Sequence, residues 1–199
     1  RQRQMCIRDR WPVKSTDVND HGTPDMFAGG KFTTKDGRAN LMAHDWEAPS
    51  ELPDDEYPLI LCTVREVGHY SCRSMTGNCK TLALLADEPG FVRMNPADAQ
   101  ARGIKNGDIV SIHSRRGQVY SRADVSDRIN KGTVYMTYQW WIGACNELVS
   151  ENLSPITKTP EYKYCAVNVE RIADQRAAEQ YVIDEYTKLK ASLRESAIG

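Results

Sequence analysis

The sequence predicts a small closed β-barrel, mainly β with some α, that is followed by a C-terminal helix. Several short apolar runs are separated by turn residues, and a single capped helix interrupts them. A stretch of 21 residues, 139–159, has no regular pattern. A long irregular segment inside a compact domain is usually functional. We therefore expect one face of the barrel to carry a site.

The barrel is expected over residues 58–172, and each element has a start or stop signal. Asn95 is a helix N-cap, Pro96 lies in the first turn and Gly103 ends the helix. Asn106-Gly107-Asp108 is a tight turn between two apolar runs. The expected strands are 58–64, 91–94, 109–114, 118–125, 133–138 and 163–171, and a short helical stretch covers 80–86.

The tail, 173–199, has the composition of an amphipathic helix. One stripe at helical spacing carries Ala178, Val182, Tyr186, Leu189 and Leu193. Packing of this stripe against the barrel explains it more simply than a partner helix does.

The first 57 residues are expected to lie outside the barrel. Residues 1–10 (RQRQMCIRDR) have no helical or strand period and resemble translated adapter sequence, so we expect a non-native segment that packs against nothing. Residues 11–57 are assigned to the end of a preceding domain. They include a hairpin at 31–43, turned by Asp36-Gly37, and an acidic, proline-marked linker at 49–57. The natural protein is expected to continue upstream.

Composition excludes several classes of protein. With 26 basic and 27 acidic residues the net charge is −1, which argues against a nucleic-acid or membrane-surface protein. No apolar run is long enough for a membrane span, and no secretory signal is visible. The cysteines at 6, 62, 72, 79, 145 and 165 form no CxxC pair, so neither a zinc ribbon nor a ferredoxin-type cluster is encoded.

The segment 63–79 (TVREVGHYSCRSMTGNC) is the strongest candidate for a binding loop. It follows an apolar run and has no apolar period of its own. Arg65 and Arg73 offer planar forks for phosphate oxygens, and Glu66 is suited to accept paired N–H groups from a guanine or pterin edge. On composition alone, an ordinary surface loop remains an equal alternative.

Three further sets of candidate residues have simpler explanations. Cys72 lies three residues from His69 and suggests a nucleophile, but no third orienting group is evident. Trp140 and Trp141 more often bury area in a core than stack on a ligand. His113 and Arg115-Arg116 lie at a strand end and turn, where we expect them to be solvated.

Longer motifs carry a resemblance to a known family. The chain runs from a TxRxxxH loop through FVRMNPADAQARGIKNGD and IVSIHSRRGQVYSRADVS to a late NxL segment. This order resembles the C-terminal dinucleotide-binding domain of molybdopterin oxidoreductases. Three stretches resemble the molybdenum and selenium formate dehydrogenases within it: PLILCTVREVGHYSCRSMTGNC, YMTYQWWIGACNEL and NLSPITKTPEYKYCAV. Val149 departs from the threonine that the family usually has in NxLT.

The resemblance implies an aspartate-decarboxylase-like double-psi β-barrel. It also implies a bis-(molybdopterin guanine dinucleotide) cofactor with molybdenum or tungsten, held between this domain and upstream ones. A 4Fe-4S cluster and the selenocysteine or cysteine metal ligand would lie upstream, so no catalytic or metal-binding residue is expected here. By motif position, the cofactor-binding residues are Arg65, Glu66, His69, Ser71, Tyr138, Tyr162 and Lys163. Without the resemblance, His69 would be read as a hydrogen-bonded loop histidine.

The implied function is that of a fragment of a cytoplasmic formate dehydrogenase of anaerobic metabolism, inactive by itself. Its implied partners are the upstream domains, an iron–sulfur electron-transfer subunit and a hydrogenase complex. One alternative is another molybdenum or tungsten oxidoreductase, such as the nitrate reductase type, or a free-standing small subunit. Another is a non-catalytic double-psi barrel binding module. A pyruvoyl decarboxylase would need a Gly-Ser bond, which the sequence lacks.

Overall fold

The structure, a computed structural model, describes residues 16, 17, 22, 26–86 and 88–196, and of 193–196 the backbone only. The expectation for residues 1–10 lies outside the described residues. Contacts divide the chain into two compact units, Arg1–Glu47 and Ala48–Gly199, and the barrel belongs to the second.

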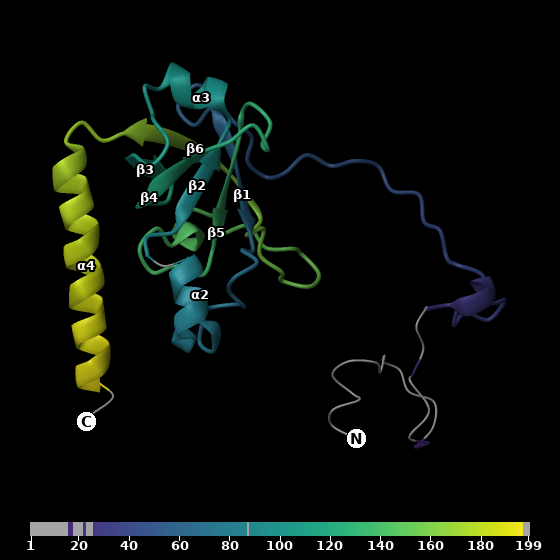
Figure 1. The fold of residues 1–199 in the computed structure, drawn as a ribbon. Coiled ribbons are helices and arrows are strands. Elements are labelled where there is room, and N and C mark those ends of the chain that lie inside the picture. The colour runs from purple at the N-terminus through teal and green to yellow at the C-terminus, as the bar shows by residue number, and fades with distance from the viewer. Residues whose placement is uncertain (1–15, 18–21, 23–25, 87, 197–199) are drawn as a thin grey trace. The chain divides into compact units, whose positions relative to one another are not determined.

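Six strands close the barrel in the order β1-β5-β2-β4-β3-β6 (Figure 1). The pairs β1–β5 and β2–β4 are parallel, whereas the other neighbours are antiparallel. This confirms the expected double-psi β-barrel. The strands are β1 (Leu59–Val64), β2 (Phe91–Met94), β3 (Ile109–His113), β4 (Gln118–Val125), β5 (Thr133–Thr137) and β6 (Tyr164–Arg171).

The core is built by side chains that alternate along the strands. In β1, Leu59 and Leu61 are buried and their neighbours are less so, as the two-residue period of a strand requires. Leu61 lies opposite Val134 of β5 on one side and Cys165 of β6 on the other. Each such buried side chain stabilises the fold by roughly 1.5–3 kcal/mol.

The predicted helix between β2 and β3 forms with the expected cap. It is α3 (Pro96–Ala101), and the Asn95 side chain accepts a hydrogen bond from the Ala97 N–H at 2.9 Å. Gly103, at φ +63°, takes the left-handed conformation that favours glycine after a helix. Three shorter elements are η2 (Thr76–Asn78) and α2 (Lys80–Leu85) in the loop after β1, and η3 (Cys145–Glu147) after β5.

The C-terminal helix α4 (Gln175–Ser196) lies along the outside of the barrel (Figure 1). Ala178 and Val182 are buried against Ile109, which explains why β3 is buried on both faces. The Gln175 side chain also exchanges two hydrogen bonds with the Ile109 backbone, at 2.7 and 2.8 Å. The expected packing of this stripe is therefore confirmed for its first half. Among the residues that the structure describes, no helix combines the length and apolar character that a membrane crossing requires.

The hairpin expected at 31–43 does not form. The segment contains a turn, in which the Phe32 N–H donates to the Gly37 carbonyl at 2.9 Å, but its described residues include no strand. Leu41 and Met42 are 92% and 87% exposed. A two-stranded hairpin that buries no apolar face is marginal in water, and this explains the difference.

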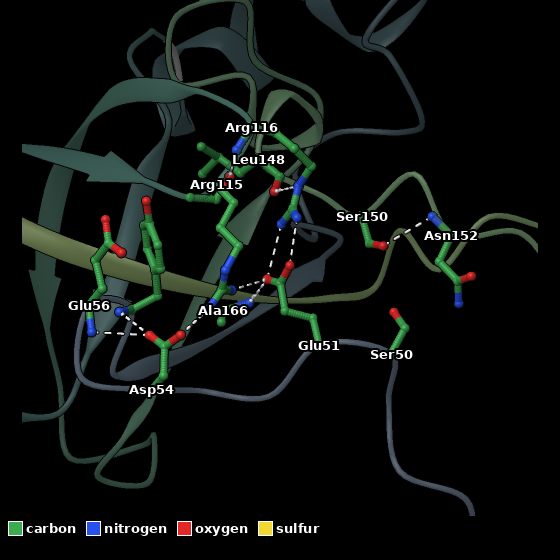
Figure 2. Close-up of polar contacts among 12 residues, drawn as sticks. Ser50, Glu51, Asp54, Glu56, Arg115, Arg116, Leu148, Ser150, Asn152 and Ala166 are labelled. Carbon is green, nitrogen blue, oxygen red and sulfur yellow. Dashed lines mark hydrogen bonds and ion pairs between the residues drawn. The ribbon is translucent and has the colours of Figure 1, made fainter.

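The turn arginines Arg115 and Arg116 are not simply solvated, contrary to expectation (Figure 2). Two Arg116 nitrogens donate to the two oxygens of Glu51, at 2.5 and 3.0 Å. The Ala166 N–H donates to Glu51 as well, at 2.6 Å, and Arg115 pairs with Asp54. The linker is thus bound to the barrel, although the domain boundary after residue 57 stays a prediction.

Candidate functional site

The site begins where two parallel strands end side by side. Val64 of β1 lies opposite Thr137 of β5, so the residues that follow them emerge at the same end of the barrel. Arg65 Nε donates a hydrogen bond to the Tyr138 hydroxyl at 3.1 Å. This bond, together with the attraction of the tyrosine oxygen, raises the pKa of Arg65 further. Arg65 is therefore a permanent cation with a defined orientation.

Lys163 reaches the same place from the start of β6. Strand β6 is antiparallel to β1, and the Thr63 N–H donates to the Lys163 carbonyl at 3.2 Å. The Lys163 ammonium lies 5.2 Å from the ring centre of Tyr138 and 5.0 Å from that of Tyr162. Both distances are within the range of a cation–π contact.

Four of the seven predicted residues thus form one group. We call it the cation cluster: Arg65, Tyr138, Tyr162 and Lys163. Arg65, Tyr162 and Lys163 are exposed and Tyr138 is partly buried, so both cations are open to an incoming ligand. Two fixed cations on an aromatic support suit the oxygens of a phosphate or pyrophosphate group.

Glu66 faces a cavity of about 670 Å³ beside this cluster. The wall also contains Arg65, Arg93, Tyr135 and Thr137, and apolar side chains of α2. Glu66 accepts a hydrogen bond from Gln139 Nε2 at 3.2 Å. Burial raises the pKa of Glu66, and the nearby His69, Gln139 and Arg93 only partly offset this. The cavity therefore offers an acceptor next to cations.

His69 is 2% exposed, and both ring nitrogens are engaged. Nε2 lies 2.8 Å from the Ala86 carbonyl oxygen and Nδ1 lies 3.1 Å from Thr76 Oγ1. A carbonyl can only accept, so Nε2 carries a proton and donates to the Ala86 oxygen, while Nδ1 pairs with the Thr76 hydroxyl. In this arrangement His69 holds the loop against Trp140, with ring centres 5.5 Å apart. A direct contact with a ligand stays a prediction.

Ser71 lies farther along the same loop and is exposed. Its φ of 48° is in the left-handed region, which is uncommon for serine. The structure does not bring Ser71 into the cation cluster, and its role also stays a prediction.

Arg73, expected to offer a fork to phosphate, is instead part of a buried ion pair. Its Nη2 lies 2.5 Å from Glu88 Oε1, and its guanidinium stacks 4.4 Å from the Trp140 ring centre. The Glu88 side chain is fully buried and also accepts from the N–H groups of Trp141 and Ile142, at 3.0 and 3.1 Å. This pair fixes the loop after β1 to the segment after β5.

Arg93 and Gln139 lie inside the stretches that resemble the family, but neither was assigned a role from sequence. Arg93 lies on β2 beside β5, lines the cavity and pairs with Asp124 at 2.6 Å. Gln139 directly follows Tyr138 and contacts Glu66. The signal that could have found them is their place within these stretches, next to Tyr138 in the case of Gln139.

A nucleophilic role for Cys72 receives no support. Its pKa is lowered, mainly by a hydrogen bond from the Ser74 backbone. However, the His69 nitrogens contact Thr76 and Ala86, so His69 is not placed as its base. Within the described part of the chain, no group of three or more His, Cys, Asp or Glu residues could hold a metal ion.

Known proteins match this chain in overall sequence, in fold and in a family profile. Formate dehydrogenase H of Escherichia coli is 64% identical over 190 residues, which are 96% of this chain and 26% of that protein. The F420-dependent formate dehydrogenase subunit alpha of Methanocaldococcus jannaschii is 39% identical over 162 residues, 81% of this chain and 24% of that protein. The chain thus spans about a quarter of the length of these relatives.

The fold and the family have independent support. Acetylene hydratase from Pelobacter acetylenicus superposes with a TM-score of 0.51 over 58% of this chain and 18% of that structure, at 17% identity, which is a similarity of fold alone. The profile of the family described as molydopterin dinucleotide binding domain matches residues 59–166, which include every strand up to the start of β6. The chain therefore belongs to the family of molydopterin dinucleotide-binding domains.

Proposed function

We propose that this chain is the cofactor-binding part of a formate dehydrogenase, and that its cation cluster binds phosphate groups of a bis-(molybdopterin guanine dinucleotide). The observation that carries the proposal is the convergence of Arg65 and Lys163 on Tyr138. Family membership and relatives named as formate dehydrogenases support the choice of cofactor and of reaction.

The residues present fit the chemistry of this cofactor. Its pyrophosphates need cations, which Arg65 and Lys163 supply, and its guanine and pterin rings need acceptors for N–H groups, which Glu66 supplies. His69 and Ser71 belong to the same loop and complete the proposed set. The bound group supplies the molybdenum or tungsten at which formate is oxidised to carbon dioxide. This chain contributes binding, orientation and electrostatics.

The other parts of the proposed enzyme lie outside this chain. We place the metal ligand and a 4Fe-4S cluster in upstream domains of the same polypeptide, since the relatives are about four times as long. An iron–sulfur electron-transfer subunit, a hydrogenase complex and the cytoplasm are the proposed partners and location. The chain alone is expected not to oxidise formate. A formate dehydrogenase is favoured over a nitrate reductase type of enzyme by the 64% identity over 96% of the chain.

The test uses the full-length protein that contains this chain. Arg65→Ala and Lys163→Ala each remove a charge-assisted contact of roughly 1.5–3 kcal/mol, so cofactor affinity should fall by about 10- to 100-fold. Metal content per protein and formate-dependent dye reduction should fall together. Lys131→Ala, which removes an exposed lysine outside the cation cluster, is the matched control. Unchanged metal content and formate activity in both site variants would contradict the proposal.

A further inference from the structure

Gln139 is a buried residue, and one atom of its side-chain amide has no hydrogen-bond partner among the described residues. Its side chain is 2% exposed, and Nε2 donates to Glu66 Oε2 at 3.2 Å. Its Oε1 has no hydrogen-bond partner among the described residues. A buried acceptor without a donor is unfavourable and rare in folded proteins. The amide oxygen therefore needs a donor that the described residues do not supply, and a bound ligand could provide it.

The position of Gln139 indicates where that donor comes from. Gln139 follows Tyr138 of the cation cluster and precedes Trp140, which is buried. Through its bond to Glu66, it lies one hydrogen bond behind the wall of the 670 Å³ cavity. The bond also occupies one carboxylate oxygen of Glu66 and leaves the other available. Glu66 thus keeps one acceptor oxygen at the cavity wall, and the unpaired oxygen of Gln139 lies enclosed in the layer behind it.

The acceptor side chains of Glu66 and Gln139 suit a different part of a ligand than the cations Arg65 and Lys163 do. A phosphate presents only oxygen atoms, and these would face the oxygens of Glu66 and Gln139 unfavourably. An aminopyrimidinone ring, as in guanine and pterin, presents a ring N–H and an amino group side by side. Two donors side by side match a pair of acceptors, so we assign the phosphates to Arg65 and Lys163 and the ring edge to Glu66 with Gln139 behind it.

We infer that Gln139 is a positioning and specificity residue: it holds the Glu66 carboxylate at the cavity wall and, with it, selects a ligand that carries the N–H edge of an aminopyrimidinone. This inference rests on the proposed function, because it assigns the ring of the same cofactor. It gives a role to a residue that lies within a family stretch but was assigned none from sequence, and a reason for its burial.

The test compares two nucleotides that differ at that edge. The ¹⁵N-labelled 199-residue chain is titrated with guanosine diphosphate and with inosine diphosphate, which lacks the 2-amino group, and both are followed by NMR. Inosine diphosphate makes one hydrogen bond fewer to a charged or buried acceptor, so it should bind about tenfold more weakly than guanosine diphosphate. The Gln139 side-chain amide signals should shift with guanosine diphosphate and much less with inosine diphosphate. These measurements use the unaltered chain and require no variant to fold.

Variants then test whether Gln139 causes the difference in affinity between the two nucleotides. Gln139→Met should bring the two affinities together and leave the weaker phosphate-dependent binding in place, whereas Gln100→Met, at an exposed position on α3, should preserve the tenfold ratio. Equal affinities in the unaltered chain would overturn the inference and leave the proposed function standing. Failure of both nucleotides to shift the Arg65 and Lys163 signals would overturn the proposed function with it.

Discussion

Arg65 donates a hydrogen bond from Nε to the hydroxyl of Tyr138, although the two residues are 73 positions apart. They meet because β1 and β5 run parallel and end together, so that the first residue after each strand projects from the same end of the barrel. Tyr138 also lies under the Lys163 ammonium. One aromatic side chain thus supports both cations of the cluster.

Tyr138→Phe separates these two roles. The ring remains beneath Lys163, but Arg65 loses its hydrogen-bond partner and its fixed orientation. We expect binding of pyrophosphate to weaken by about three- to tenfold, the equivalent of one hydrogen bond of about 0.5–1.5 kcal/mol. Isothermal titration of the chain with pyrophosphate measures this. Tyr181→Phe, at a half-exposed tyrosine of α4, should change nothing, and equal affinities for all three proteins would contradict the role of the hydroxyl.

Local signals predicted the barrel elements well, because each element has its own chemistry in sequence. The alternation of apolar residues in β1 and the Asn95-Pro96 start of α3 act over a few residues, and both form as predicted. The hairpin at 31–43 had an equally good local signal in Asp36-Gly37. It fails because strand formation also needs a partner surface, which no local pattern reports.

Ion pairs over long distances in sequence were beyond prediction from composition. Arg73 and Arg116 both looked like free surface cations, yet closure of the barrel places Glu88 and Glu51 beside them. The family motifs found the cation cluster because they mark positions, and position determines which segments meet. They could not show that His69 would be buried, since that depends on the Ala86 carbonyl at the end of α2.

Gly90, just before β2, allows Trp140 of the segment after β5 to pack directly against the backbone. A Cβ atom at this position would lie 2.1 Å from Trp140 Cδ1, and Trp140 is only 3% exposed. Gly90→Ala should lower the free energy of unfolding by about 2–3 kcal/mol. Urea unfolding followed by tryptophan fluorescence measures it.

Gly68→Ala is the matched control for Gly90→Ala, because no atom lies within 4 Å of the added Cβ. Its effect should stay within about 0.5 kcal/mol. A loss in Gly90→Ala no larger than this would mean that Trp140 moves freely.

Glu51 should make the stability of the barrel depend on pH. Burial acts to raise the pKa of its carboxyl, but hydrogen bonds from Arg116 and the Ala166 N–H outweigh this and keep the pKa below its usual range. The folded state therefore binds fewer protons than the unfolded state. The resulting stability is present above the unfolded pKa and is lost as pH falls through the folded pKa.

Glu51→Gln should accordingly cost about 2–3 kcal/mol at neutral pH, and the cost should disappear in acid. Urea unfolding from neutral pH down through the carboxyl range measures the difference at each pH. Glu151→Gln, at an exposed glutamate, provides the comparison. A cost for Glu51→Gln that stays constant over this range would show that the charge of Glu51 is not what binds the linker.

Glu66 should show the opposite pH dependence, because burial raises its pKa. The folded state then binds more protons than the unfolded state, so the ionised carboxylate destabilises the fold above its folded pKa. This penalty is relieved as pH falls through the folded pKa and is gone below the unfolded one. Glu66→Gln removes the charge and retains an amide that can hydrogen-bond to Gln139. It should raise the free energy of unfolding by about 0.5–2 kcal/mol at neutral pH, and the gain should vanish in acid.

The same substitution should weaken binding of guanosine diphosphate, since a neutral amide is a poorer acceptor for the ring edge than a carboxylate. Stability and binding would then change in opposite directions, as expected when a charge is kept in a partly buried site for its ligand. Glu147→Gln, at an exposed glutamate of η3, should alter neither quantity. If Glu66→Gln instead lowered stability at neutral pH, attraction to His69, Arg93 and Arg73 would outweigh burial, and Glu66 would have to be regarded as part of a stabilising charge network.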